Sequence, residues 1–192
     1  MIYYSATGNI YRLARAVEEG AKEAGAELRF RKVRELAPEE AVKSNPAWYE
    51  HTLETQDVPE ASPEDMEWAD AYVFGTPARF GNGSSQLKQF IDTLGGLWAE
   101  SKLADKVVGV FTSASTVHGG QETTIASLFN VFVHWGAVVV PLGYTDEAIF
   151  STGNPYGASS TEEPTEQELA VARYQGWRIA EKAEALARGS RV

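Results

Sequence analysis

An apolar run at residues 107–111 ends abruptly in small polar residues and glycines, and a helical pattern begins soon afterwards. A buried strand that runs into such a loop before a helix is typical of open α/β sheets, in which ligands bind outside the carboxyl ends of the strands. The same succession follows residues 1–4 and 71–75, which lead into loops 5–9 and 76–83. Three loops of this kind at one sheet edge predict a pocket that can hold a phosphate, a sugar and a flat ring together.

Strand-like and helical patterns alternate along the chain, which favours a parallel sheet covered by helices on both faces. Alternation at residues 27–33 and an apolar run at 137–141 predict two further strands. Apolar residues recur at helical spacing between the strands and through the tail at 166–187. We therefore expect one domain over residues 1–192, an α/β fold with a flavodoxin-like, doubly wound sheet of five parallel strands in the order 2-1-3-4-5.

Two connections are longer than this plan needs, at residues 35–70 and 143–164. Loops longer than about 12–15 residues are usually functional or mobile. Both carry aromatic residues, so we expect them to reach a neighbouring subunit or to roof the pocket. The alternative is that they decorate the surface.

The charge balance argues against a nucleic-acid partner. The chain has 17 basic and 27 acidic residues, a formal net charge of −10, and its basic residues are scattered. Nucleic-acid binding usually depends on basic residues that neutralise phosphates. We therefore expect no nucleic acid among the partners.

Several other classes lack the residues they need. The absence of cysteine excludes disulfides, thiolate metal sites and cysteine nucleophiles. The three histidines, His51, His118 and His134, do not have the spacing of metal ligands, so no metal is expected. No G-x-S-x-G hydrolase motif is present. No long apolar run or charged-then-apolar leader is present, so we expect no membrane insertion and a cytoplasmic location.

Loop 5–9 is a candidate phosphate site. Exposed backbone N–H groups at a helix start attract anions, and Gly8 allows the backbone to approach closely. Ser5, Thr7 and Asn9 can add donors, all of them neutral. The alternative is that these side chains only cap the helix.

Loop 76–83 is a candidate ring-binding segment. Pro77 stiffens the turn, and the backbone can present polar groups to the edge of a heterocycle while Phe80 covers its plane. The alternatives are a surface salt bridge for Arg79 and core packing for Phe80. Trp98 follows paired glycines at the end of the next helical pattern and is either a cap contact or a site residue.

Taken together, the three loops resemble the WrbA family of flavodoxin-like NAD(P)H:quinone oxidoreductases. The resemblance rests on six stretches: YYSATGNI at 3–10, FGTPARFGNGSSQLKQFIDTLGGLW at 74–98, GGQETTI at 119–125, HWGAVVVPLGY at 134–144, NPYGAS at 154–159 and ARYQG at 172–176. The two long connections are where this family departs from simple flavodoxins.

The resemblance implies FMN as cofactor and NADH or NADPH as electron donor. It places the FMN phosphate in the first loop, the isoalloxazine against the second and the ring and ribityl chain along the third. The implied cofactor-binding residues are Ser5, Ala6, Thr7, Gly8, Asn9, Ile10, Pro77, Ala78, Arg79, Phe80, Ser113, Ala114, Ser115, Thr116, Val117, His118 and Gly119, with His134 added from the aromatic box described next.

The resemblance further implies a homotetramer in which an aromatic box over the flavin is completed across subunits. Its members would be Phe80, Trp98 and His134, the last from a neighbour, with Trp98 and His134 as the candidate catalytic residues. Thr7 and Ala78 depart from the family, which has a tyrosine and a threonine there, and the loop at 112–120 is one residue longer.

The function implied is the two-electron reduction of a quinone by NAD(P)H. The nicotinamide nucleotide would leave before the quinone enters the same box, which gives ping-pong kinetics. The alternative is a flavodoxin-type carrier of single electrons, for which an acidic surface suits basic protein partners.

Overall fold

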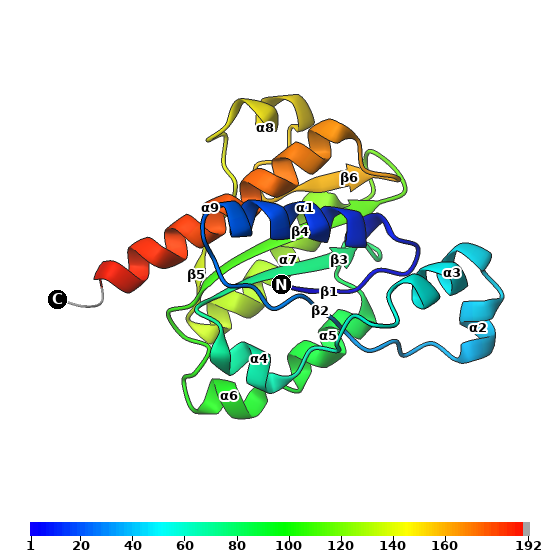
Figure 1. Ribbon diagram of the computed structural model, residues 1–192, viewed down its shortest axis with the longest axis horizontal. Coiled ribbons are helices and arrows are strands. Elements are labelled where there is room, and N and C mark those ends of the chain that lie inside the picture. The colour runs from blue at the N-terminus through cyan, green and yellow to red at the C-terminus, as the bar shows by residue number, and fades with distance from the viewer. Residues whose placement is uncertain (190–192) are drawn as a thin grey trace.

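A computed structural model describes residues 1–189 of the chain. Its centre is a parallel sheet in the order β2-β1-β3-β4-β5, as the sequence predicts (Figure 1). The strands are β1 (Ile2–Tyr3), β2 (Arg31–Lys32), β3 (Ala71–Pro77), β4 (Val107–Ala114) and β5 (Val138–Val139).

The two central strands, β3 and β4, form the longest ladder of the sheet. Ala71 pairs with Val107, and the register continues to Pro77 opposite Ser113. Both strands are buried along nearly their whole length, which explains their continuous apolar sequences. Both also extend beyond the predicted runs, because polar Thr76 and Thr112 continue the ladder.

The outer strands are shorter than predicted. Of residues 27–33, only Arg31 and Lys32 pair with β1, and of residues 137–141, only Val138 and Val139 pair with β4. A sixth strand, β6 (Ser159–Thr161), pairs in parallel with the carboxyl half of β4. Sequence reasoning missed β6, because its Ser-Ser-Thr sequence has none of the apolar alternation that marks a strand.

Helices cover both faces of the sheet, as expected. On one face, α1 (Asn9–Glu23) packs against α9 (Glu166–Gly189), and Figure 1 shows the two side by side. Their contact depends on Gly20 and Gly176, since a Cβ at either position would lie within 2 Å of a backbone oxygen of the other helix. On the other face, α5 (Ser85–Asp92) and α7 (Gln121–Trp135) bury their apolar sides against β3 and β4.

The first long connection folds into three short helices, α2 (Glu39–Lys43), α3 (Pro46–Glu54) and α4 (Pro63–Trp68). The second contains α8 (Glu147–Thr152) and β6, and α6 (Gly95–Ala99) follows α5. In Figure 1, α2 and α3 lie at the end of the sheet where β1 leads into α1, whereas α6 lies near the opposite end.

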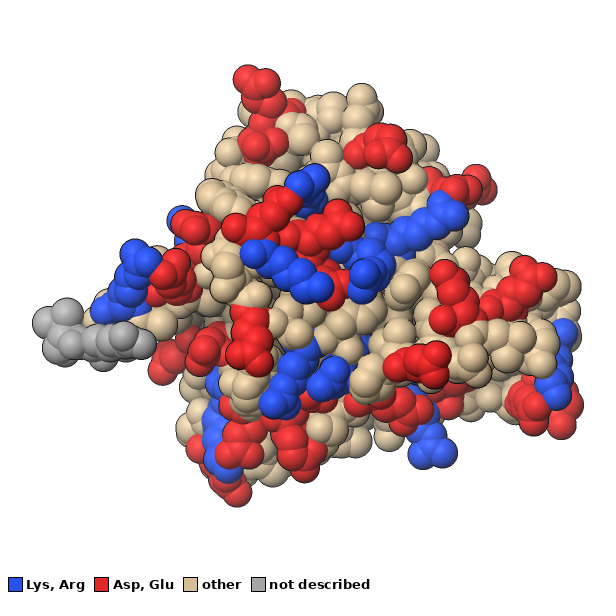
Figure 2. Space-filling view, in the orientation of Figure 1, with Lys and Arg blue, Asp and Glu red and all other residues tan. Residues whose placement is uncertain are grey.

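Charged residues of both signs are interspersed on the face formed by α1 and α9 (Figure 2). Ion pairs such as Arg173–Glu23 join the two helices there. No helix within residues 1–189 combines the length and the apolar character needed to cross a membrane.

Candidate functional site

The three predicted loops meet at the carboxyl edge of the sheet and enclose a cavity of about 80 Å³. Each loop follows one of three adjacent strands, β1, β3 and β4. The lining is small or polar apart from Ile10, and consists of Ser5, Ala6, Thr7, Asn9, Ile10, Pro77, Ala78, Arg79, Ser113, Ala114 and Ser115.

The first loop is held by Ser5 in a turn that presents free amides. Gly8 is the N-cap of α1 and has a φ of 101°, a left-handed conformation that favours glycine. The Ser5 Oγ accepts hydrogen bonds from the N–H groups of Gly8 (3.1 Å) and Tyr11 (3.3 Å). No described protein group accepts from the N–H groups of Thr7, Asn9 and Ile10. Ser5 therefore does cap the helix start, yet amides remain available for an anion.

Direct hydrogen bonds join the second loop to the strand beside it. The Ala78 N–H donates to the Ser113 carbonyl at 2.8 Å, and the Thr112 hydroxyl donates to the Thr76 carbonyl at 2.6 Å. Arg79 and Asn82 exchange backbone hydrogen bonds of 2.8 and 3.0 Å, which closes a tight turn. This turn fixes Phe80 between them.

Phe80 is fully exposed, at 101% relative accessibility, and has a φ of 53°. A bulky residue in the left-handed region is strained, and an exposed ring gains nothing from burial. Core packing is thus ruled out for Phe80. Arg79 forms no salt bridge with a described residue, so that alternative also lacks support. Both side chains are free to contact a ligand or another chain.

The third loop places only its first part in the cavity. Ser113, Ala114 and Ser115 line it, whereas the expected contacts further along are at or near the surface: Thr116, Val117, His118 and Gly119. A Cβ on Gly120, whose φ is 85°, would lie 2.9 Å from the Gly81 Cα. The second and third loops therefore touch through two glycines, a contact that sequence reasoning missed although both glycines stand in its motifs.

A second feature missed from the sequence is a polar network around Glu35. Its carboxylate accepts hydrogen bonds from the Tyr4 hydroxyl (2.7 Å), the Trp48 indole (3.1 Å) and the Gln86 amide (2.9 Å). Burial raises the pKa of Glu35, but hydrogen bonds from the N–H groups of Ala37 and Leu36 and from the Gln86 and Tyr4 side chains outweigh it. They leave the pKa below its usual value. The network joins the end of β1, next to the first loop, to α3 and α5.

Trp98 and His134 lie together, but away from the cavity. The Trp98 indole N–H donates to the His134 carbonyl at 2.9 Å, and the Trp98 side chain is half exposed. Helix α7 begins beside the second loop at Gly120, and His134 lies 14 positions further along it. At 1.5 Å per residue that is about 21 Å. Within one chain, neither residue joins the other predicted contacts.

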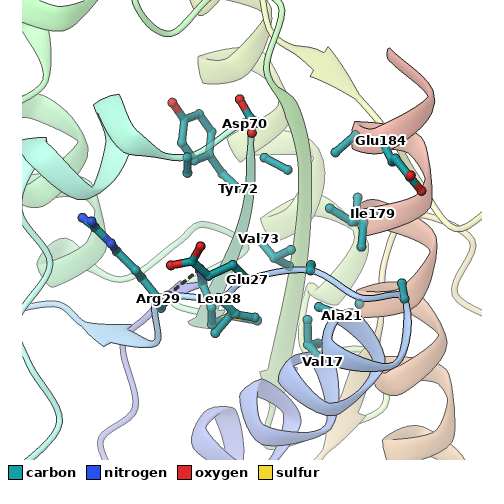
Figure 3. A pocket seen from close by; sticks show the side chains of 18 of the residues that line it. Val17, Ala21, Glu27, Leu28, Arg29, Asp70, Tyr72, Val73, Ile179 and Glu184 are labelled. Carbon is teal, nitrogen blue, oxygen red and sulfur yellow. Dashed lines mark hydrogen bonds between the residues drawn. The ribbon is translucent and has the colours of Figure 1, made fainter. Parts of the chain in front are cut away.

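A larger cavity, of about 690 Å³, lies at the other end of the sheet (Figure 3). Strand β1 is short and pairs only with Phe74 and Gly75 of β3. Residues 71–73 of β3 therefore have no neighbouring strand on that side, and the cavity opens there. Its side chains come from α1, α9, β3 and the segment before β2, and include Val17, Ala21, Glu27, Leu28, Arg29, Tyr72, Val73 and Ile179. Because ligands of such folds bind at the carboxyl ends of the strands, the smaller cavity is the candidate site.

Residues 4–147 match the profile of a family described as NADPH-dependent FMN reductase. The chain belongs to this family. It is 52% identical over 162 residues to an NAD(P)H dehydrogenase (quinone) of Deinococcus radiodurans, covering 84% of this chain and 81% of the relative. It is 44% identical over 187 residues to an enzyme of the same name from Archaeoglobus fulgidus, covering 97% of both chains.

Solved structures agree with the family assignment. The flavodoxin, WrbA-like protein from Agrobacterium tumefaciens is 27% identical and superposes with a TM-score of 0.70, covering 96% of this chain and 95% of that one. An archaeal flavodoxin, 16% identical with a TM-score of 0.63, shares the fold over 95% of this chain and 96% of its own. The WrbA resemblance and the flavodoxin-like fold are thus confirmed.

Proposed function

We propose that this protein is an FMN-dependent NAD(P)H:quinone oxidoreductase. The observation that carries the proposal is the cavity at the carboxyl edge of β1, β3 and β4. Its first loop offers amides with no acceptor among the described residues, and the exposed ring of Phe80 follows its lining residue Arg79 in sequence. The family membership and the names of the relatives support it. We also propose that residues 1–192 form a single domain, a proposal supported by the return of both long connections to the one sheet.

The first loop fits the phosphate of FMN. The amides of Thr7, Asn9 and Ile10 have no acceptor within residues 1–189, and they lie at the positive end of the α1 dipole. The Ser5 hydroxyl accepts two amide bonds and can still donate its proton. A phosphate can therefore be held by neutral donors in a chain of net charge −10.

The remaining predicted residues are assigned by loop. Ser5 to Ile10 hold the phosphate, Pro77 to Phe80 lie against the ring, and Ser113 to Gly119 follow the ribityl chain and ring. When bound, FMN supplies hydride-transfer chemistry between a nicotinamide nucleotide and a quinone. Phe80 offers a flat apolar wall. Nicotinamide and quinone are both flat, so we expect them to occupy the place beside Phe80 in turn, with ping-pong kinetics.

We also propose a homotetramer in which a neighbouring subunit supplies Trp98 and His134. Within one chain these residues lie together on the surface, far from the cavity. If a neighbouring subunit placed Trp98 and His134 beside Phe80, the exposed Phe80 ring would be covered. This differs from the sequence prediction in that Trp98 accompanies His134 from the neighbour. We also propose a cytoplasmic location for this protein.

The direct test is anaerobic mixing of the FMN-loaded protein with NADH and then with benzoquinone. NADH should bleach the flavin absorbance, and benzoquinone should restore it. A failure of either step at useful rates would reject the enzyme.

A flavodoxin-type electron carrier is the second candidate, favoured by the fold and the acidic charge. A monomer in sedimentation, with a stable blue semiquinone on stepwise reduction, would favour that carrier over the oxidoreductase.

A further inference from the structure

The first long connection places a buried histidine next to the first loop. His51 lies on α3, and Figure 1 shows α3 near the point where β1 leads into α1. Its side chain is only 5% exposed, although most of α3 is solvent-exposed. A histidine is rarely buried to this degree without a specific partner.

The partners of His51 come from its own helix and from the first turn of α1. Its Nδ1 lies 2.9 Å from Glu54 Oε2, and its ring centre lies 5.3 Å from that of Tyr11. A Cβ built on Gly8 would lie 3.7 Å from the same Nδ1, which is ordinary van der Waals contact. The imidazole thus packs on the Tyr11 ring and lies next to the Gly8 turn, with space between them for no more than a methyl group.

This turn has few other restraints. Gly8 has no Cβ, and its φ of 101° is one conformation among many that glycine can adopt. Ser5 Oγ ties the turn from the loop side through the N–H groups of Gly8 and Tyr11. His51 contacts the Tyr11 ring and lies beside Gly8, and these are the two residues whose amides Ser5 binds.

The orientation of the turn decides whether the free amides converge on an anion. The amides of Thr7, Asn9 and Ile10 flank Gly8 in sequence, so a rotation at Gly8 would turn them relative to each other. Anion binding at a helix start depends on that convergence. A residue that prevents the rotation before the ligand arrives reduces the ordering cost of binding.

We propose that His51, anchored by Glu54, is a positioning residue for the phosphate-binding loop and sets the preference of this chain for FMN over riboflavin. The inference rests on the proposed function, because it assumes that the first loop binds the FMN phosphate. Riboflavin has the same ring and ribityl chain without the phosphate, so a defect confined to the loop affects FMN alone.

The test is a fluorescence titration of the apoprotein with FMN and with riboflavin. His51→Leu removes the polar edge that Glu54 anchors. His51→Asn retains a donor near the position of Nδ1. We expect His51→Leu to weaken FMN binding at least about tenfold, because the Gly8 turn loses the anchored imidazole beside it, and riboflavin binding less than about twofold. His51→Asn should recover most of the FMN affinity.

A second pair of variants covers the case in which His51→Leu does not fold. Glu54→Leu removes the anchor at a mostly exposed position, and Glu50→Leu is a matched control on the exposed part of the same helix. Glu54→Leu should lower the ratio of FMN to riboflavin affinity about threefold, consistent with a modest polar contact, and Glu50→Leu should leave it unchanged.

Three results would overturn the inference. Equal loss of both flavins in His51→Leu would show a general structural role, and unchanged FMN affinity would show that the loop does not need His51. If Glu54→Leu and Glu50→Leu had the same ratio of FMN to riboflavin affinity, Glu54 would not anchor His51 for phosphate binding. Failure of the proposed function would be seen in the unmodified protein itself. That protein would then bind neither flavin, or would bind FMN no more tightly than riboflavin.

Discussion

The indole N–H of Trp98 donates a 2.9 Å hydrogen bond to the backbone carbonyl of His134. This bond joins α6 to the last turn of α7, so the two predicted catalytic residues form one surface unit. Both therefore approach a flavin together or not at all. The unit is remote from the cavity of its own chain. A change in Trp98 or His134 should therefore affect catalysis without affecting the binding of FMN.

Replacement of Trp98 should test that separation. We expect Trp98→Ala to lower NADH:benzoquinone activity at least about tenfold, because the aromatic box loses one wall. The Kd for FMN should change less than about threefold, since the phosphate loop is untouched. Steady-state kinetics and fluorescence titration give the two values. A parallel loss of FMN affinity would place Trp98 in the cofactor cradle itself.

Thr7→Phe should block the phosphate site. The cavity has a volume of about 80 Å³, and Thr7 lines it. A phenyl ring there would exclude the phosphate, so FMN affinity should fall by about two orders of magnitude or more. Glu19→Phe is the control, because it adds the same ring at an exposed position of α1 away from the cavity. Unchanged FMN affinity in Thr7→Phe would show that the phosphate lies elsewhere.

Glu35→Gln should destabilise the apoprotein by about 1.5–3 kcal/mol at pH 7, the typical value of hydrogen bonds to a charged group. The pKa of Glu35 is lowered in the folded state, so its carboxylate stabilises the protein above the unfolded value of 4.5. That contribution is lost as the pH falls through the folded pKa. Urea unfolding of both proteins from pH 7 down to pH 3 should show the difference shrinking below 4.5. A difference independent of pH would assign the effect to packing.

Gly120→Ala should disturb the contact between the second and third loops. The new Cβ would lie 2.9 Å from the Gly81 Cα, and the φ of 85° is unfavourable for alanine. Gly25→Ala is a matched control, because Gly25 has a φ of 83° and no atom within 4 Å of the new Cβ. Strain in φ costs about 1–2 kcal/mol in both. Only Gly120→Ala should also weaken FMN binding, and equal behaviour of the two would show that the loop contact is dispensable.

The sequence predicted the strand order and the three loops, because apolar runs, glycines and helical spacing are local signals. It did not predict the Glu35 network or the position of His51. Both join the first long connection to β1 or α1, and such long-range side-chain contacts have no periodic pattern. The distance of His134 from the cavity could have been predicted from the length of α7. A 15-residue helix places a residue near its end far from the loop at its start.

Strand β6 has a consequence for self-association. It covers the carboxyl half of β4 opposite Thr112–Ala114, and β5 covers Val107–Val108. The longest strand of the molecule is therefore flanked along most of its length, and the sheet terminates in strands of two or three residues on both sides. Margins this short are poor templates for cross-chain β pairing or fibril growth. Copies of this chain should therefore assemble through helices and loops, with each sheet remaining separate.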